Sequence, residues 1–144
     1  MKLDIKHEPL SFDLHGVGGW VWDTNYAGAA FKLMEGLWPV IKEKGIKNTG
    51  INYWVYKGPN RLFTCVELID GDGSDIFEHV PIELKRYAYY KHIGPYERLG
   101  EVYTGIHQEF NEQLLAESGV AVEKYGHWTD DISKLETAIF IGLR

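Results

Sequence analysis

The segment Arg86–Arg98, Arg-Tyr-Ala-Tyr-Tyr-Lys-His-Ile-Gly-Pro-Tyr-Glu-Arg, constrains the fold more than any other part of the chain. Its tyrosines favour a β-strand, because aromatic side chains pack well on a pleated surface. Gly94 and Pro95 end that strand, and proline suits the first turn of a helix. The segment therefore predicts a strand that leads directly into a helix.

An earlier segment, Ser11–Gly19, has the same arrangement of a strand-like run, glycine and then a helical pattern. Residues of the two halves correspond at spacings of 74 to 76: Gly18 with Gly94, Gly45 with Gly119, and Trp54 with Trp128. We therefore predict two β-α-β-β units, at about residues 1–70 and 76–144, joined by a solvated turn.

Hydrophobic periodicity gives the elements of each unit. Apolar side chains recur at helical spacing in residues 27–44 and 100–117, which predicts two helices with core-facing stripes. We expect Pro39 to kink the first helix or end its regular part, Gly45 and Gly119 to end the two helices, and Gly16–Gly19 to reverse the chain. Strands are expected within residues 3–14, 50–57, 62–69, 77–84, 86–92, 121–128 and 135–143.

One such unit cannot cover its sheet face with a single helix. Two units can share a core about a pseudo-twofold axis, and a cleft at that axis is a natural ligand site. We therefore predict one α+β domain with an antiparallel sheet, two main helices and a central cleft. The 144 residues of the chain suffice for such a core.

Charge and residue content disfavour several classes of function. A net charge of −6 disfavours nucleic acid and anionic membranes, which attract clusters of Lys and Arg. Cys65 is the single cysteine, so it can form neither a disulfide framework nor a cysteine-based zinc site. Residues 70–75 lack the spacing of a calcium loop, and the six histidines lack metal-ligand spacing. We expect no metal, no cofactor and, because no apolar run reaches membrane length, a cytoplasmic protein.

Aromatic residues make up 14% of the chain, which fits either a well-filled core or an aromatic-lined cavity. Trp20 and Trp22 lie in a loop-like segment, where they could cover an apolar site or close one end of the core. The sequence leaves both alternatives open.

Glu123 is the candidate for charge recognition. Strand alternation places Glu123, Tyr125 and His127 on one face. If that face borders the cleft, the carboxylate is buried among rings and needs a counter-charge, which an organic cation can supply. The alternatives are an exposed Glu123 or one paired with Lys124, and a structural His127. Alternation in the first unit selects Tyr53 for the cleft.

The order of these motifs resembles a known family. Tyr87–Tyr96, a helix, Val122–Tyr125 and the closing Ile139–Ile141 strand together resemble the GyrI-like small-molecule-binding domain, which is also the effector-binding domain of multidrug-responsive bacterial transcription activators. The resemblance covers nearly the whole chain, although the first half is matched mainly by layout. It implies a central pocket for bulky, apolar and often cationic compounds. It also implies a buried acidic residue on the strand after the second helix, where Glu123 stands.

The resemblance implies a bacterial small-molecule-binding protein. The family's DNA-binding region precedes this module, whose motifs begin near Met1 here, so we expect the stand-alone form. Two alternatives remain: a hydrolase of cyclopropane-bearing alkylating compounds, with Glu123 and Tyr125 as catalytic groups, and a protein-interaction module like the family's gyrase-inhibiting namesake. The predicted ligand-binding residues are Glu123, Tyr53, Tyr125, Tyr89, Trp20, Trp22 and Trp38.

Overall fold

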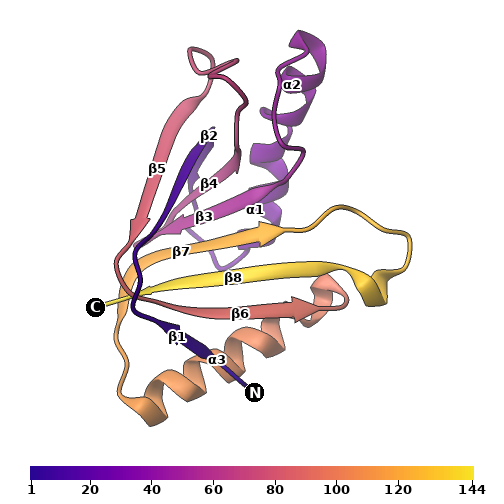
Figure 1. Cartoon of the computed structure of the whole chain (residues 1–144). Helices are drawn as coiled ribbons and strands as arrows, with labels where there is room; N and C mark the ends of the chain where they lie inside the picture. The colour runs from indigo at the N-terminus through magenta and orange to yellow at the C-terminus, as the bar shows by residue number, and fades with distance from the viewer.

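A curled antiparallel sheet of eight strands forms the body of the protein, in the order β1-β6-β8-β7-β3-β4-β2-β5 (Figure 1). The structure is a computed structural model and describes residues 1–144. Its strands are β1 (Asp4–Lys6), β2 (Leu10–Trp20), β3 (Tyr53–Lys57), β4 (Arg61–Val66), β5 (Glu78–Leu84), β6 (Tyr87–Ile93), β7 (Glu117–Tyr125) and β8 (Glu136–Leu143). Its helices are α1 (Tyr26–Met34), α2 (Trp38–Lys44) and α3 (Leu99–Gln113), with short 3-10 helices η1 (Tyr96–Arg98) and η2 (Ile132–Lys134).

The two β-α-β-β units meet at the centre of this sheet. One unit contributes β2, β4 and β3, the other contributes β6, β8 and β7, and β3 pairs with β7 across the pseudo-twofold axis. The two remaining strands are exchanged between the units. Strand β1 precedes β2 in the chain but pairs with β6, whereas β5 precedes β6 but pairs with β2. This exchange ties the edge of each unit to the other one.

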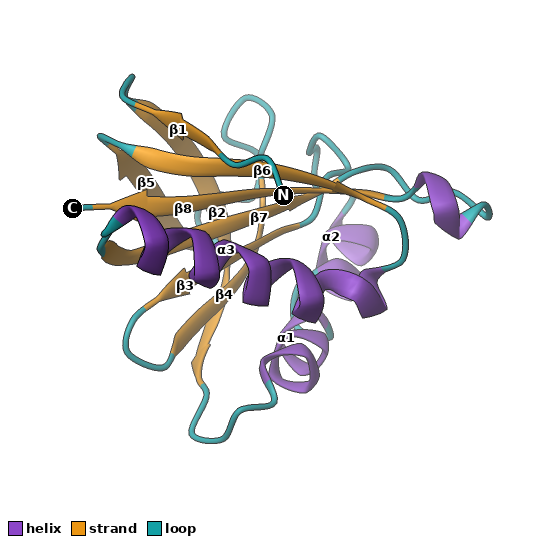
Figure 2. Cartoon of the chain, turned by 90° about the horizontal axis from the view of Figure 1, so that it is seen from below, coloured by secondary structure: helices purple, strands orange, loops and turns teal.

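The helices lie on one side of the sheet (Figure 2). Helix α3 packs through Val102, Ile106 and Phe110 against β6 and β8, while Ala30 of α1 packs near the central strands. On the opposite face the sheet curls, so that apolar side chains of β2 and β5 pack against those of β3, β4 and β7. The helix side is therefore the one on which helices and sheet can enclose a cavity.

The first helix region is divided in two. Residues 35–37 separate α1 from α2, and Pro39 stands in the first turn of α2, where its missing N–H costs nothing. Gly45 ends α2 with φ 61°, as the sequence predicts. No helix of the protein combines the length and the apolar character that crossing a membrane requires.

Two glycine predictions are wrong. Helix α3 ends at Gln113, with Leu114 as its C-cap, and not at Gly119. The Leu115 amide donates to the Phe110 carbonyl at 2.9 Å, and Leu115 packs back onto the core, which closes the last turn without glycine. Gly119 lies instead in an irregular part of β7 with φ 99°. Gly16–Gly19 do not reverse the chain, because they lie inside β2. Glycine is needed at position 16, since a Cβ atom there would overlap the carbonyl oxygen of Thr64 on β4.

Candidate functional site

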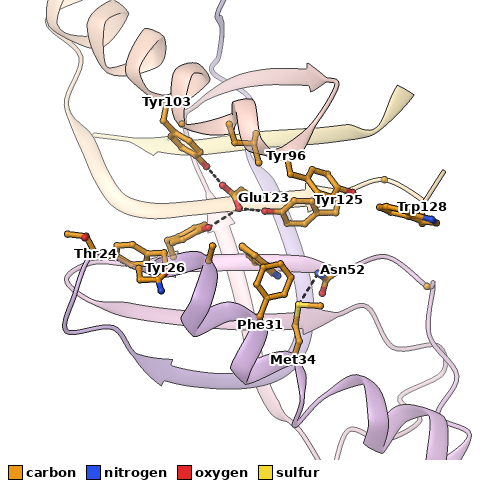
Figure 3. A pocket seen from close by; sticks show the side chains of 18 residues that line it. Thr24, Tyr26, Phe31, Met34, Asn52, Tyr96, Tyr103, Glu123, Tyr125 and Trp128 are labelled. Atoms are coloured by element: carbon orange, nitrogen blue, oxygen red, sulfur yellow. Dashed lines mark hydrogen bonds between the residues drawn. The ribbon is translucent and has the colours of Figure 1, made fainter. Parts of the chain in front are cut away.

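A cavity of about 700 Å³ lies between the helices α1 and α3 and the central strands of the sheet (Figure 3). Strands β3 and β7 supply its floor, and the loop after β7 supplies one rim. Glu123 is the only charged residue among the 18 that line it. Aromatic rings make up much of the wall: Tyr26, Phe31, Trp54, Tyr56, Tyr96, Tyr103, Tyr125 and Trp128.

The pairing of β3 with β7 decides which side chains face the cavity. Trp54 is directly opposite Glu123, so both point to the helix side of the sheet. Tyr56 and Tyr125 are each two residues away along their strands and therefore point the same way. Two adjacent strands from different halves of the chain thus place an acid and three rings on one surface.

Glu123 is only 3% exposed, and three tyrosine hydroxyls donate hydrogen bonds to it. Its Oε1 accepts from Tyr56 at 2.8 Å and from Tyr125 at 2.6 Å, and its Oε2 accepts from Tyr103 of α3. No Lys, Arg or His forms an ion pair with this carboxylate. Its hydrogen-bonding needs are largely met, but its negative charge has no partner.

The three tyrosines remain hydrogen-bond donors over a wide pH range. Burial raises the pKa of Tyr56, Tyr103 and Tyr125 far above the usual value of 10, and the negative charge of Glu123 raises it further. A tyrosinate next to a buried carboxylate would bring two negative charges together away from water. The hydroxyls therefore stay protonated and directed at Glu123.

Ring-to-ring contacts hold the aromatic wall in place. Trp54 meets Tyr125 edge-to-face at 5.1 Å between centroids, and Phe31 at 5.7 Å. Tyr96 also meets Tyr125 edge-to-face, at 5.4 Å between centroids. Such contacts contribute about 0.5–1.5 kcal/mol each beyond simple burial. The rings therefore present largely preformed faces to whatever enters the cavity.

The two ends of the cavity differ. In Figure 3, Asn52, Met34 and Trp128 lie on one side of Glu123, and Tyr26 lies on the other. The Asn52 amide donates to the Met34 sulfur at 3.6 Å and accepts from Trp38 Nε1 at 3.3 Å. Trp128 is 69% exposed, and Thr24 on the side of Tyr26 is exposed too, so solvent-exposed residues border the cavity on both sides.

Comparison with known proteins finds no matching family profile and no matching curated sequence. The fold itself has solved counterparts. The EcmrR C-terminal domain superposes with a TM-score of 0.72 and 15% identity, over 99% of this chain and 97% of that one. SAV2435 bound to tetraphenylphosphonium gives 0.65 and 14%, over 100% and 94%. A hydrolase from Listeria innocua gives 0.59 and 13%, over 99% and 92%. At these identities the likeness establishes a shared fold.

Among the residues singled out from the sequence, the structure places Glu123 and Tyr125 in the cavity wall. Trp38 lies behind the wall and touches it through Asn52. Trp20 and Trp22 stack on each other at 5.5 Å and are 55% and 79% exposed, outside the cavity lining. Trp20, the last residue of β2, and Trp22, in the loop after it, therefore neither cover the cavity nor fill the core.

Tyr53 and Tyr89 lie on the opposite face of the sheet. Tyr53 is directly opposite Lys124, which alternates with Glu123, so its side chain points away from the cavity and into the curled core. Burial raises the pKa of Tyr53 to about 12. Tyr89 packs on Phe140, which belongs to the same face. Trp54 and Tyr56 occupy the cavity positions of β3 instead.

Several lining residues are not identified by the sequence argument. Tyr103 is part of the apolar stripe predicted for the second helix, and nothing in that stripe indicates that its hydroxyl bonds a carboxylate. Trp54 and Tyr56 follow from alternation once the pairing of β3 with β7 is known. His127 lies beyond the end of β7 and is exposed, so it does not continue the face of Glu123 and Tyr125.

Proposed function

We propose that this chain binds hydrophobic organic cations as a GyrI-like domain, built from units at about residues 1–70 and 76–144. The observation that carries the proposal is Glu123: a carboxylate that is buried, hydrogen-bonded by three tyrosines and in no ion pair. Glu123 is the charge anchor of the cavity, and the rings around it are the contact surface for the ligand.

The energetics favour a positively charged guest. A buried charge without a counter-ion is costly, and a cation in the cavity relieves that cost. Ring faces add about 0.5–2 kcal/mol each where a desolvated cation lies over them. The volume of about 700 Å³ is that of a site for a drug-sized molecule. A hydrophobic cation fits the buried charge, the ring faces and the volume of the cavity at once.

The structural likenesses support the same ligand class. SAV2435, which shares this fold, has been solved with tetraphenylphosphonium, a bulky cation whose charge is shielded by four rings. The EcmrR C-terminal domain has the same fold. The cavity of this chain has the acid and the aromatic rings that such a cation requires, which is why we propose the same class of ligand here.

Tetraphenylphosphonium titration followed by tryptophan fluorescence tests the proposal, because Trp54 and Trp128 line the cavity. We expect saturable quenching with the wild type, and little or none with the anion tetraphenylborate. Glu123→Gln should weaken phosphonium binding by at least about tenfold, while Glu136→Gln, at a half-exposed carboxylate paired with Lys91, should not. Equal affinity in wild type and Glu123→Gln would rule out the charge anchor.

A hydrolase acting on cyclopropane-bearing alkylating compounds would use the same cavity, and the likeness to the Listeria innocua hydrolase is the observation in its favour. Glu123 would have to activate water, although tyrosine hydroxyls already occupy most of its acceptor positions. Mass spectrometry of such a compound after incubation distinguishes the two functions. Multiple turnovers lost in Glu123→Gln would establish hydrolysis, and recovery of intact compound would leave binding alone.

A further inference from the structure

We propose that Tyr56, Tyr103 and Tyr125 determine which cations the cavity accepts, by occupying the hydrogen-bond acceptor positions of Glu123 and so favouring cations without N–H groups. This selectivity rests on the proposed cation-binding function. Its consequence is that quaternary ammonium, phosphonium and similar cations bind in preference to protonated amines of the same shape.

The acceptor positions of Glu123 are nearly filled. A carboxylate has about four lone-pair positions, two on each oxygen. Tyr56 and Tyr125 occupy both positions on Oε1, and Tyr103 occupies one on Oε2. One position is left for a ligand. A quaternary cation needs none, because it interacts through charge and ring faces alone.

A protonated amine has more demanding needs. A secondary ammonium brings two N–H donors and a primary ammonium brings three, and each buried donor left unpaired is costly. Glu123 can receive only one of them without displacing a tyrosine. The amine therefore enters the cavity with donors that its only charged acceptor cannot satisfy.

Other acceptors in the wall compensate only in part. The tyrosine oxygens retain lone pairs after donating, but they are neutral and bind a donor about half as strongly as a carboxylate. The Asn25 Oδ1 caps α1 by accepting from the Gly28 amide at 3.0 Å, and the Asn52 Oδ1 accepts from Trp38. Each of these two side-chain amide oxygens therefore has at most one acceptor position left.

Two matched cations test the proposal: dibenzyldimethylammonium, which has no N–H group, and dibenzylammonium, which has two. Calorimetric titration near neutral pH gives the ratio of their affinities. For the wild type we expect a ratio of about ten or more in favour of the quaternary cation. Because the two methyl groups add apolar surface, the decisive quantity is the change of this ratio between variants, in which the methyl contribution cancels.

Tyr125→Phe and Tyr56→Phe each free one position on Oε1, and Tyr103→Phe frees one on Oε2. Each variant should lower the ratio by about threefold or more, because the amine gains an acceptor and the quaternary cation does not. Three variants from three elements keep the test decisive if one of them folds poorly. Tyr96→Phe is the matched control, since Tyr96 lines the cavity but donates no hydrogen bond to Glu123, and it should leave the ratio unchanged.

The results separate the two proposals. If the wild type binds both cations with an equal ratio in all variants, the tyrosine selectivity is overturned and cation binding stands. If the Tyr96→Phe ratio falls as much as the others, the effect belongs to ring polarity in general and the proposal is again overturned. If the wild type binds neither these cations nor tetraphenylphosphonium, the cation-binding function itself fails, and the selectivity fails with it.

Discussion

Trp54 and Glu123 lie directly opposite each other across the β3–β7 strand pair, one from each half of the chain. The pair stands at the centre of an eight-stranded sheet, where neither strand is an edge. A rigid position suits a charge that must not relax towards water, since Glu123 keeps its partners only if β3, β7 and α3 stay in place. The floor of the cavity therefore belongs to the central strands of the sheet.

Tyr103→Phe should lower the free energy of unfolding by about 1.5–3 kcal/mol, the usual contribution of a hydrogen bond to a charged group. Tyr103 is the link between α3 and Glu123 of β7, and its loss leaves a buried carboxylate oxygen without a donor. Urea unfolding measures the change. Tyr96→Phe, on the neighbouring 3-10 helix, should stay within about 0.5 kcal/mol of the wild type, and an equal loss in both variants would contradict the role of the carboxylate bond.

Of the nine tyrosines, Tyr56, Tyr103 and Tyr125 should resist ionisation most strongly in the folded protein. The folded-state pKa values of Tyr56, Tyr103 and Tyr125 are raised above 10, so these residues favour the folded state below that pH and lose this contribution as the pH rises above it. Absorbance of tyrosinate should increase in two stages, the second coinciding with unfolding.

The same titration of Glu123→Gln gives the comparison. Without the negative charge, the three hydroxyls should ionise at lower pH than in the wild type, because the charge of Glu123 is the largest cause after burial of their raised pKa. If all nine tyrosines of the wild type ionised in one step before unfolding, the buried hydrogen bonds of Tyr56, Tyr103 and Tyr125 to Glu123 would be contradicted.

Phe31→Ala should weaken binding of a hydrophobic cation several-fold while lowering the free energy of unfolding by no more than about 1.5 kcal/mol, the contribution of its contact with Trp54. Phe31 is 61% exposed, so its removal creates little cavity in the core, but its ring stacks edge-on against Trp54 at the cavity wall. Fluorescence titration and urea unfolding measure the two effects. Leu114→Ala, at an apolar side chain that is 91% exposed outside the cavity, should change neither quantity.

Folding stability should decrease as the pH falls below 6.5, partly through His15. Burial and the charge of the neighbouring His79 lower the pKa of His15 from 6.5, although Asp13 opposes this. The unfolded chain therefore binds a proton that the folded chain resists, and acid favours unfolding. His15→Phe keeps the ring stacked on His79, at 4.7 Å between centroids in the wild type, but removes the titration.

Urea unfolding between about pH 7.5 and pH 5.5 checks this. The loss of stability over that range should be smaller in His15→Phe than in the wild type. His127→Phe, at an exposed histidine, should lose as much as the wild type does. The same acid sensitivity in all three proteins would exclude His15 as a source.

The order of elements follows from the sequence because its signals are local. The tyrosine-rich strand, the Gly94–Pro95 switch and the glycine at the end of α2 each act within a few residues, and the structure has them where the sequence places them. The end of α3 does not follow, because Leu115 replaces the glycine signal with an apolar contact to the core. The predicted correspondence of Trp54 with Trp128 also fails, because Trp54 lies within β3 whereas Trp128 follows the end of β7.

The sequence does not determine which face of β3 lines the cavity. Corresponding residues of the two halves are 74 apart, an even number, so the odd-numbered face of β7 that holds Glu123 predicts the odd-numbered face of β3, with Tyr53, for the cavity. The actual pairing sets Glu123 opposite Trp54, and a slip of one residue moves every side chain to the other side of a strand. Sequence periodicity identifies two alternating faces, but only pairing between distant strands decides which one is enclosed.

By itself the sequence determined the α+β class, the duplicated units and an acidic residue on a strand among aromatics, because propensity and alternation are written in neighbouring residues. Only the tertiary structure decided that Tyr56, Tyr103 and Tyr125 converge on Glu123. These tyrosines come from a strand of the first half, a helix and a strand of the second half, and no local pattern encodes the meeting of side chains that are 67 and 20 residues away from their partner in the chain.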